Sequence, residues 1–183
     1  MRVQMFGHTG WDFEQTPRHS RQATTVEWYT PTEIVEAARM TMGSIDLDPC
    51  TITNNPTGAR MFYTAETDGL TKEWFGNVWL NPPFGEGFVE WMHKANSEIA
   101  SGRVSQMICL IPTWTNSKWF QSFGDHGVSL CFPRPIRFIN GTTMEPGKPA
   151  MSPNVIVYIG TRHREFAQQF RQFGLVARGL NNQ

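Results

Sequence analysis

The chain has 183 residues, enough for one domain with a substantial hydrophobic core. Hydrophobic residues make up 39% of it, and no apolar run approaches the roughly 20 residues that a membrane-spanning helix requires. The N-terminus lacks an apolar signal-peptide core, and three widely spaced cysteines exclude a disulfide framework and a zinc motif. We therefore expect a soluble cytoplasmic protein that needs no metal.

Charge is distributed unevenly although the net charge is zero. Residues 1–101 contain 7 Lys+Arg and 13 Asp+Glu, whereas residues 102–183 contain 9 Lys+Arg and 3 Asp+Glu. Such an asymmetry indicates partners better than the total charge does. The basic second half suits contact with the phosphates of a nucleic acid.

The first predicted helix follows a segment without clear periodicity. Residues 1–26 are predicted to form a flexible arm. Thr30 is a plausible N-cap, with Pro31 at the first helical position and Glu33 at the third. An apolar stripe then continues until Gly43, where the helix is predicted to end.

Strands and helices alternate along the rest of the chain. Strands are predicted over 44–48, 59–63, 77–80, 105–111, 128–132, 136–139 and 154–159. Helices are predicted over 88–99, 117–123 and 162–173. The alternation indicates an α/β fold: a mostly parallel sheet with helices on both faces and an antiparallel edge. We expect a single domain over 27–175 and a polar tail over 176–183.

The tetrapeptide Asn81-Pro82-Pro83-Phe84 directly follows the predicted strand 77–80. The Asn side-chain carbonyl and the backbone carbonyl of Pro82 can accept hydrogen bonds from a planar amine, and the Phe84 ring can stack on it. Two prolines restrict φ and remove two backbone donors, so these carbonyls are held in place. This arrangement suits methyl transfer to an exocyclic NH2 group, although a plain proline turn would also explain the tetrapeptide taken alone.

Three further segments are suited to hold a cofactor. The segment 28–31, W-Y-T-P, stands at a predicted helix start, where free N–H groups favour a carboxylate. The segment 47–50, L-D-P-C, leaves the first strand and places Asp48 where ligands bind in open α/β sheets. The segment 67–70 contains D-G-L in a turn before the strand 77–80.

Taken in order, these motifs and L-I-P-x-x-T-N-S-K-W-F resemble the phage-type DNA N6-adenine methyltransferases, the Dam family, over roughly residues 27–160. The resemblance implies a Rossmann-like methyltransferase sheet, the cofactor S-adenosylmethionine and double-stranded DNA as substrate. It also implies a bacteriophage gene acting in the bacterial host cytoplasm, in the setting of restriction-modification.

The resemblance also implies roles for individual residues. The cofactor-binding residues would be Tyr29, Thr30, Pro31, Asp48, Cys50 and Asp68, with Asp68 on the adenine side of the cofactor. The catalytic residues that grip the target base would be Asn81, Pro82, Pro83 and Phe84. One departure is the loop 50–58, which has a single late glycine where amino-methyltransferases often carry several.

DNA contacts are expected in the basic half, because the chain leaves little room for a separate recognition domain. Sequence specificity would come from loops within 112–152 or from a partner. The candidate DNA-binding residues are Trp114, Lys118, Arg134 and Arg137. For Trp114, as for Trp119, core packing is at least as good an explanation as base stacking.

Other functions remain open at this stage. Pro49-Cys50 resembles the Pro-Cys nucleophile of cytosine-C5 methyltransferases, but no Glu-Asn-Val motif accompanies it, so a small buried cysteine is the favoured interpretation. An enzyme acting on RNA or on a glutamine side chain would use the same N-P-P-F site, whereas a cytosine N4 target is less favoured. A non-catalytic DNA-binding protein of the same fold is a further alternative, which cofactor binding would separate from an enzyme.

Overall fold

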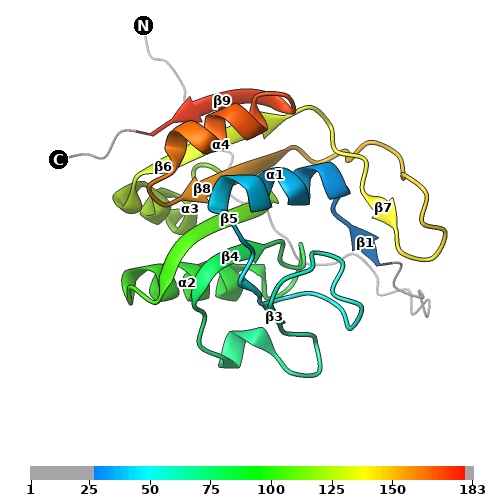
Figure 1. Cartoon of the computed structure of the whole chain (residues 1–183), viewed down its shortest axis with the longest axis horizontal. Helices are drawn as coiled ribbons and strands as arrows, with labels where there is room; N and C mark the ends of the chain where they lie inside the picture. The colour runs from blue at the N-terminus through cyan, green and yellow to red at the C-terminus, as the bar shows by residue number, and fades with distance from the viewer. Residues whose placement is uncertain (1–26, 180–183) are drawn as a thin grey trace, which may run out of the picture.

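The computed structural model describes residues 27–179, so the predicted flexible arm over 1–26 lies outside the described residues. A seven-stranded mixed sheet in the order β3-β2-β4-β5-β8-β6-β9 lies between two layers of helices (Figure 1). Its strands are β2 (Leu47–Asp48), β3 (Met61–Phe62), β4 (Gly76–Leu80), β5 (Val104–Pro112), β6 (Val128–Pro133), β8 (Asn154–Ile159) and β9 (Gly174–Arg178). The fold predicted from the sequence, a Rossmann-like methyltransferase sheet with helices, is confirmed.

The helices and a small second sheet complete the structure. The helices are α1 (Thr32–Met42), α2 (Phe88–Ala100), α3 (Lys118–Phe123) and α4 (His163–Phe170), with short 3-10 turns η1 (Gly69–Thr71) and η2 (Gly124–His126). A separate two-stranded sheet pairs β1 (Trp28–Tyr29) with β7 (Ile139–Asn140) in antiparallel fashion. Within residues 27–179, every helix is too short or too polar to span a membrane.

Strand directions bring several strand ends to one edge of the sheet. Strands β3, β2, β4 and β5 run parallel. Because β8 lies antiparallel between β5 and β6, β6 again runs in the direction of β5. Thus β2, β4, β5 and β6 all end at the same edge, which we call the carboxyl edge; the opposite one is the amino edge. The chain places β3 on one side of β2 and β4 on the other, which makes a topological switch point at the ends of β2 and β4.

Two hydrophobic layers hold this sheet in place. On β4, Trp79 packs into the layer beneath α1 and α4, whereas Val78 and Leu80 pack into the layer with α2 and α3. Alternation of side chains along a strand explains how one strand supplies both layers. Both faces of the central strands are therefore buried, which leaves the ends of the strands as the place for a ligand.

The start of α1 differs from its prediction. The helix begins at Thr32, and Pro31 occupies the cap position with extended backbone and no side-chain cap hydrogen bond. Thr30 is therefore not the N-cap. Its hydroxyl instead accepts a hydrogen bond from Asn81 Nδ2 at 3.2 Å, a tertiary contact that local sequence does not encode.

Three later elements also differ. The helix predicted over 162–173 is shorter, spanning His163–Phe170, and the strand predicted over 136–139 is limited to the two residues of β7, outside the main sheet. The predicted polar tail is wrong over 176–178, because Gly174–Arg178 forms the edge strand β9 on β6. Only Val176 of this strand packs against the core. The sequence of β9 therefore lacks the regular hydrophobic pattern by which a strand is predicted.

Candidate active site

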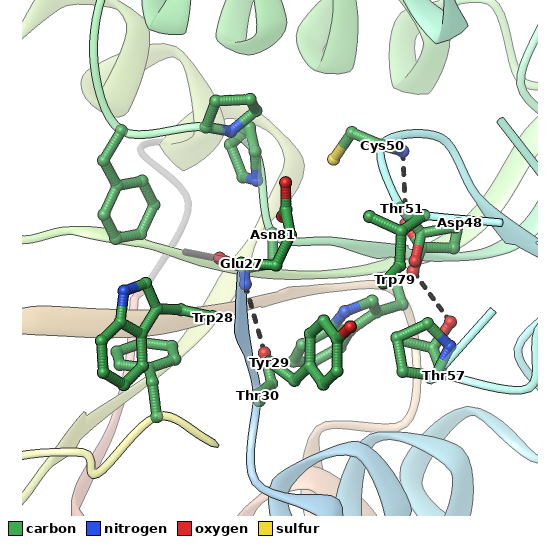
Figure 2. Close-up of a pocket in the computed structure, with 16 residues that line it drawn as sticks. Glu27, Trp28, Tyr29, Thr30, Asp48, Cys50, Thr51, Thr57, Trp79 and Asn81 are labelled. Carbon is green, nitrogen blue, oxygen red and sulfur yellow. Dashed lines mark hydrogen bonds between the residues drawn. The ribbon is translucent and has the colours of Figure 1, made fainter. Parts of the chain in front are cut away.

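A cavity of about 510 Å³ opens at the carboxyl edge, at the switch point between β2 and β4 (Figure 2). Its walls come from β1, from the segment after β2, from the N-P-P-F segment and from the region of β7. The lining residues are Glu27, Trp28, Tyr29, Thr30, Asp48, Cys50, Thr51, Ile52, Pro56, Thr57, Trp79, Asn81, Pro82, Pro83, Phe84 and Phe138. The cavity therefore unites four segments that are far apart in the sequence.

Asp48, the last residue of β2, is the buried acid of this cavity, with 3% of its surface exposed. Its carboxylate accepts hydrogen bonds from Thr57 Oγ1 at 2.8 Å and from the Cys50 backbone N–H at 3.2 Å. Burial raises the pKa of Asp48 to about 6, and these hydrogen bonds oppose part of that rise. Asp48 is thus a fixed acceptor that ionises near neutral pH.

Asn81 follows the last residue of β4 and points into the same cavity. Its Nδ2 donates to Thr30 Oγ1, which fixes the orientation of the amide. Among the described residues, neither Asn81 Oδ1 nor the Pro82 carbonyl accepts a hydrogen bond. Two carbonyl oxygens are therefore available to the hydrogens of an amine.

Aromatic rings continue from this position along the carboxyl edge. Phe84 is 46% exposed and meets Phe88 edge to face at 6.0 Å between ring centroids. Phe88 meets Trp114 in the same way at 5.4 Å and Trp119 at 5.3 Å. Trp119 is a core residue, but Trp114 is about half exposed, so core packing alone does not account for Trp114.

Cys50 faces the cavity beside Asp48 and is partly buried. Burial, together with the negative charge of Asp48, raises the pKa of its thiol well above the ordinary value. A neutral thiol is a poor nucleophile. The raised pKa thus disfavours the Pro-Cys interpretation, and the position of Cys50 in the lining agrees with a small residue packed in the wall.

The structure brings most, but not all, of the predicted cofactor residues together. Tyr29, Thr30, Asp48 and Cys50 line the cavity, and Pro31 is buried beside them at the start of α1.

Asp68 is absent from the cavity lining. It is exposed, with φ at 49°, and its carboxylate accepts a hydrogen bond from Leu70 N at 3.1 Å at the start of η1. Its local role is to cap that turn.

The predicted DNA-binding cations follow strands that end at the carboxyl edge. Lys118 is exposed at the first position of α3, which comes after β5. Arg134 and Arg137 are exposed beyond β6; each donates to a backbone carbonyl, of Gln172 and Gly147 respectively. None of these three cations is in an ion pair within residues 27–179, so their charge is available for phosphates.

Sequence reasoning missed several residues of the cavity. Thr57, in the loop after β2, holds the Asp48 carboxylate, and no motif marks it. Trp28 and Phe138 reach the cavity because β1 pairs with β7. The W-Y-T-P motif, whose first residue is Trp28, could have identified that residue, whereas no local sequence pattern indicates Phe138.

The described part of the chain contains no group of three or more His, Cys, Asp or Glu side chains that could hold a metal ion. Within residues 27–179, the cavity lining contains two acidic residues, Glu27 and Asp48, and no Lys or Arg. This combination favours a ligand that carries positive charge.

Comparison with known proteins gives a match to one family. The model of the family described as DNA N-6-adenine-methyltransferase (Dam) matches residues 17–179. No curated protein matches the chain. The crystal structure of protein LPL1258 from Legionella pneumophila str. Philadelphia 1, of family DUF519, is similar with a TM-score of 0.40 and 11% identity. That match covers 70% of this chain and 55% of the other, so the chain spans about half the length of that structure.

Proposed function

This chain belongs to the Dam family of DNA N6-adenine methyltransferases, and from that premise we propose that its cavity places S-adenosylmethionine beside Asp48 and a flipped-out adenine of double-stranded DNA beside Asn81. S-adenosylmethionine is the methyl donor of the family. Figure 2 shows Trp28 and Asp48 on opposite sides of Asn81, which supports a division of the cavity into two halves.

The residues of the cavity fit this cofactor. A volume of about 510 Å³ lies within the range of roughly 300–1,000 Å³ typical of small-molecule sites. The cofactor carries a sulfonium and an ammonium group beside a single carboxylate, so its net charge is positive. The lining residues within 27–179 supply the carboxylates of Glu27 and Asp48 and include no Lys or Arg. Tyr29, Thr30, Asp48 and Cys50 would hold it, with Pro31 shaping the wall. When bound, it supplies a methyl group that is activated for transfer by the positive sulfur.

Asn81 and Pro82 carry the observation on which this proposal rests. Two unoccupied carbonyl oxygens at the end of β4 can accept the two N6 hydrogens of adenine. Accepting both draws the nitrogen toward tetrahedral geometry and frees a lone pair that is otherwise delocalised into the ring. The chain needs no nucleophile of its own; it contributes position and electrostatic stabilisation.

Phe84 stabilises the target base outside the helix. Removing a base from the stack costs a few kcal/mol. Stacking on an aromatic side chain contributes about 1–3 kcal/mol per base, so it offsets much of this cost. Phe84 is half exposed at the cavity, and Trp28 of β1, which also lines the cavity, offers a second aromatic surface.

Double-stranded DNA would lie across the carboxyl edge. Trp114, Lys118, Arg134 and Arg137 are exposed along this edge, beyond the ends of β5 and β6. Cations on the edge that holds Asn81 would bring phosphates beside the target base.

The bacteriophage and restriction-modification setting, in the cytoplasm of the host, is part of the same proposal. It would be tested by whether expression protects host DNA from a restriction enzyme that N6-methyladenine blocks.

Methyl transfer from radiolabelled S-adenosylmethionine, followed by digestion of the DNA to nucleosides, tests the proposal. We expect label in N6-methyladenine with duplex DNA and no label with RNA or with a glutamine peptide. Label in 5-methylcytosine that Cys50→Ser abolishes would replace this function with the Pro-Cys mechanism. Calorimetry that detects no cofactor binding would instead indicate a non-catalytic DNA-binding protein.

A further inference from the structure

Residues 134–153, which connect β6 to β8, form an arm that leaves the sheet at the carboxyl edge (Figure 1, yellow, with β7). The two sides of the arm pair with each other: Gly147 N donates to Phe138 O at 2.8 Å, and Ala150 N donates to Ile136 O at 2.8 Å. Strand β1 pairs along the outer side of β7. The arm is thus a built β-structure that adds nothing to the main sheet.

The tip of the arm, residues 141–144, is a turn held by Asn140. The Asn140 side-chain oxygen accepts hydrogen bonds from Thr142 N at 2.9 Å and Thr143 N at 3.0 Å, and its backbone carbonyl accepts from Met144 N at 2.8 Å. These three bonds fix the turn, and the side chains of residues 142–144 are all exposed. The tip therefore presents a rigid set of side chains to solvent.

Met144 occupies an unusual backbone position at this tip. Its φ is 59°, in the left-handed region where glycine or asparagine is less strained, and its side chain is 64% exposed. A large apolar side chain that is neither buried nor favoured by its backbone suggests a role for the side chain itself. A partner surface would provide that role.

The charge of the arm indicates the class of partner. The arm contains Arg134, Arg137 and Lys148 but only one acidic residue, Glu145, in a chain whose net charge is zero. Within residues 27–179, the three cations have no ion-pair partner. A nucleic acid suits this arrangement. Its phosphates would contact the unpaired cations of the arm, and the edges of its bases would contact the polar and apolar side chains of the tip.

The arm is also tied to the proposed active site. Phe138 lines the cavity, and Gly141 N at the tip donates to Glu27 O at 2.7 Å. Strand β1 then leads to Thr30, which accepts the hydrogen bond from Asn81. The tip thus has a set position relative to Asn81, so bases that contact the tip would determine which adenine reaches the cavity.

We propose that the tip of the arm enters the major groove beside the flipped adenine and selects the methylation site. Thr142 and Thr143 hydroxyls would bond base edges, Met144 would pack on an apolar group such as the thymine methyl, and Arg137 and Lys148 would contact flanking phosphates. The groove is about 12 Å wide and admits such a turn. This inference rests on the proposed function and names the element that provides its sequence specificity.

Two sets of variants test it. Thr142→Ala with Met144→Gly removes tip side chains, and the glycine also suits the left-handed backbone, so the fold is preserved. Arg137→Gln with Lys148→Gln removes the phosphate contacts. Arg164→Gln with Arg178→Gln is the matched control, because both arginines are exposed on α4 and β9, outside the arm. Each protein is used to enrich bound sequences from a pool of random DNA duplexes and to methylate long DNA, whose modified adenines are then mapped.

The tip variant should bind DNA with reduced discrimination, on the order of tenfold per base pair contacted, while still producing N6-methyladenine. The Arg137 and Lys148 variant should retain its site preference, and the slope of log affinity against log salt should fall by about 0.9 for each lost contact. An unchanged sequence preference in the tip variant would overturn the inference. Wild-type protein that enriches sites without methylating adenine would contradict the proposed function and not this one.

Discussion

The two ends of β4 carry similar residues in opposite situations. Asn77, near the amino edge, donates from Nδ2 to Met42 O and to Ser44 Oγ, and its Oδ1 accepts from Gln106 Nε2, all within 3.0–3.1 Å. Asn81, at the carboxyl edge, makes one side-chain hydrogen bond, to Thr30 Oγ1, among the described residues. The side-chain amide of Asn77 is fully hydrogen-bonded within the fold, whereas that of Asn81 retains a free acceptor, Oδ1, among the described residues.

The contrast extends along both edges. At the amino edge, Tyr158 donates to Gln106 Oε1 at 2.7 Å and accepts from Arg162 N at 2.7 Å, which connects β8 to β5 and to the start of α4. A satisfied network of this kind rigidifies the structure. At the carboxyl edge, acceptors and aromatic faces point into a cavity. Unused hydrogen-bonding capacity, rather than residue type, is therefore what singles out Asn81 as the proposed binding position, whereas Asn77 serves the fold.

The largest expected effect separates the two asparagines. Asn81→Ala should lower the rate of methyl transfer on the order of a hundredfold or more, because a preorganised acceptor is lost. Affinity for S-adenosylmethionine and the free energy of unfolding should change little. Single-turnover kinetics, calorimetry and urea unfolding measure the three quantities.

Asn77→Ala is the control for that variant. It should lower the free energy of unfolding by about 1–3 kcal/mol, because the partners of this partly buried amide lose their hydrogen bonds. The rate per folded molecule should stay near that of the wild type. A large rate loss in Asn77→Ala, or none in Asn81→Ala, would remove the distinction between the two edges.

The next effect concerns the titration of Asp48. Its pKa is raised from 3.8 to about 6 in the folded protein, so folding favours the protonated form. Protonated Asp48 therefore stabilises the folded state. This contribution to the free energy of unfolding is fully present below pH 4 and is lost as pH rises through about 6, a change of about 3 kcal/mol. Asp48→Asn should flatten the pH dependence of the free energy of unfolding between pH 4 and 7.

Cofactor binding should show the opposite trend with pH. If the ionised Asp48 carboxylate accepts hydrogen bonds from the cofactor, wild-type affinity should fall below pH 6, and Asp48→Asn should bind weakly at every pH. Calorimetry across this range measures both. Equal affinity of wild type and variant at pH 7.5 would place the cofactor away from Asp48.

A smaller effect is expected at the aromatic positions that flank β4. Phe84→Ala should lower kcat/KM about tenfold through loss of base stacking, with Phe84→Trp partly restoring it. Phe75→Ala is a matched control, because Phe75 is 42% exposed just before the amino end of β4. Fluorescence of 2-aminopurine at the target position reports stacking directly, and an equal response of both variants would argue against a base-stacking role for Phe84.

The smallest effect is expected at Cys50. Cys50→Ser should leave the methyl-transfer rate nearly unchanged, because its thiol is neutral and serves as part of the cavity wall. The rate measured at saturating cofactor tests this point. Complete loss of transfer in a folded variant would restore a nucleophilic role for the thiol.

Sequence by itself determined the elements whose signals are local. The apolar stripe of α1, the buried runs of β5 and β8 and the position of Asn81 directly after a strand follow from hydrophobic period and turn chemistry. Parallel strands then imply a common edge, which is why Asp48 and Asn81 could be expected at one site. The ordered motifs identified the family, since each is weak but their sequence of occurrence is specific.

Tertiary structure alone decided how distant segments meet. No local pattern shows that β1 pairs with β7, that Thr57 holds Asp48, or that Gly174–Arg178 completes the sheet as β9. Thr30 is a residue type that commonly caps helices, yet its hydroxyl accepts a hydrogen bond from the amide of Asn81, 51 residues away. The physical reason is the same in each case: hydrophobic period records which face of an element is buried, whereas its partner is selected by packing and hydrogen bonding between segments far apart in the chain.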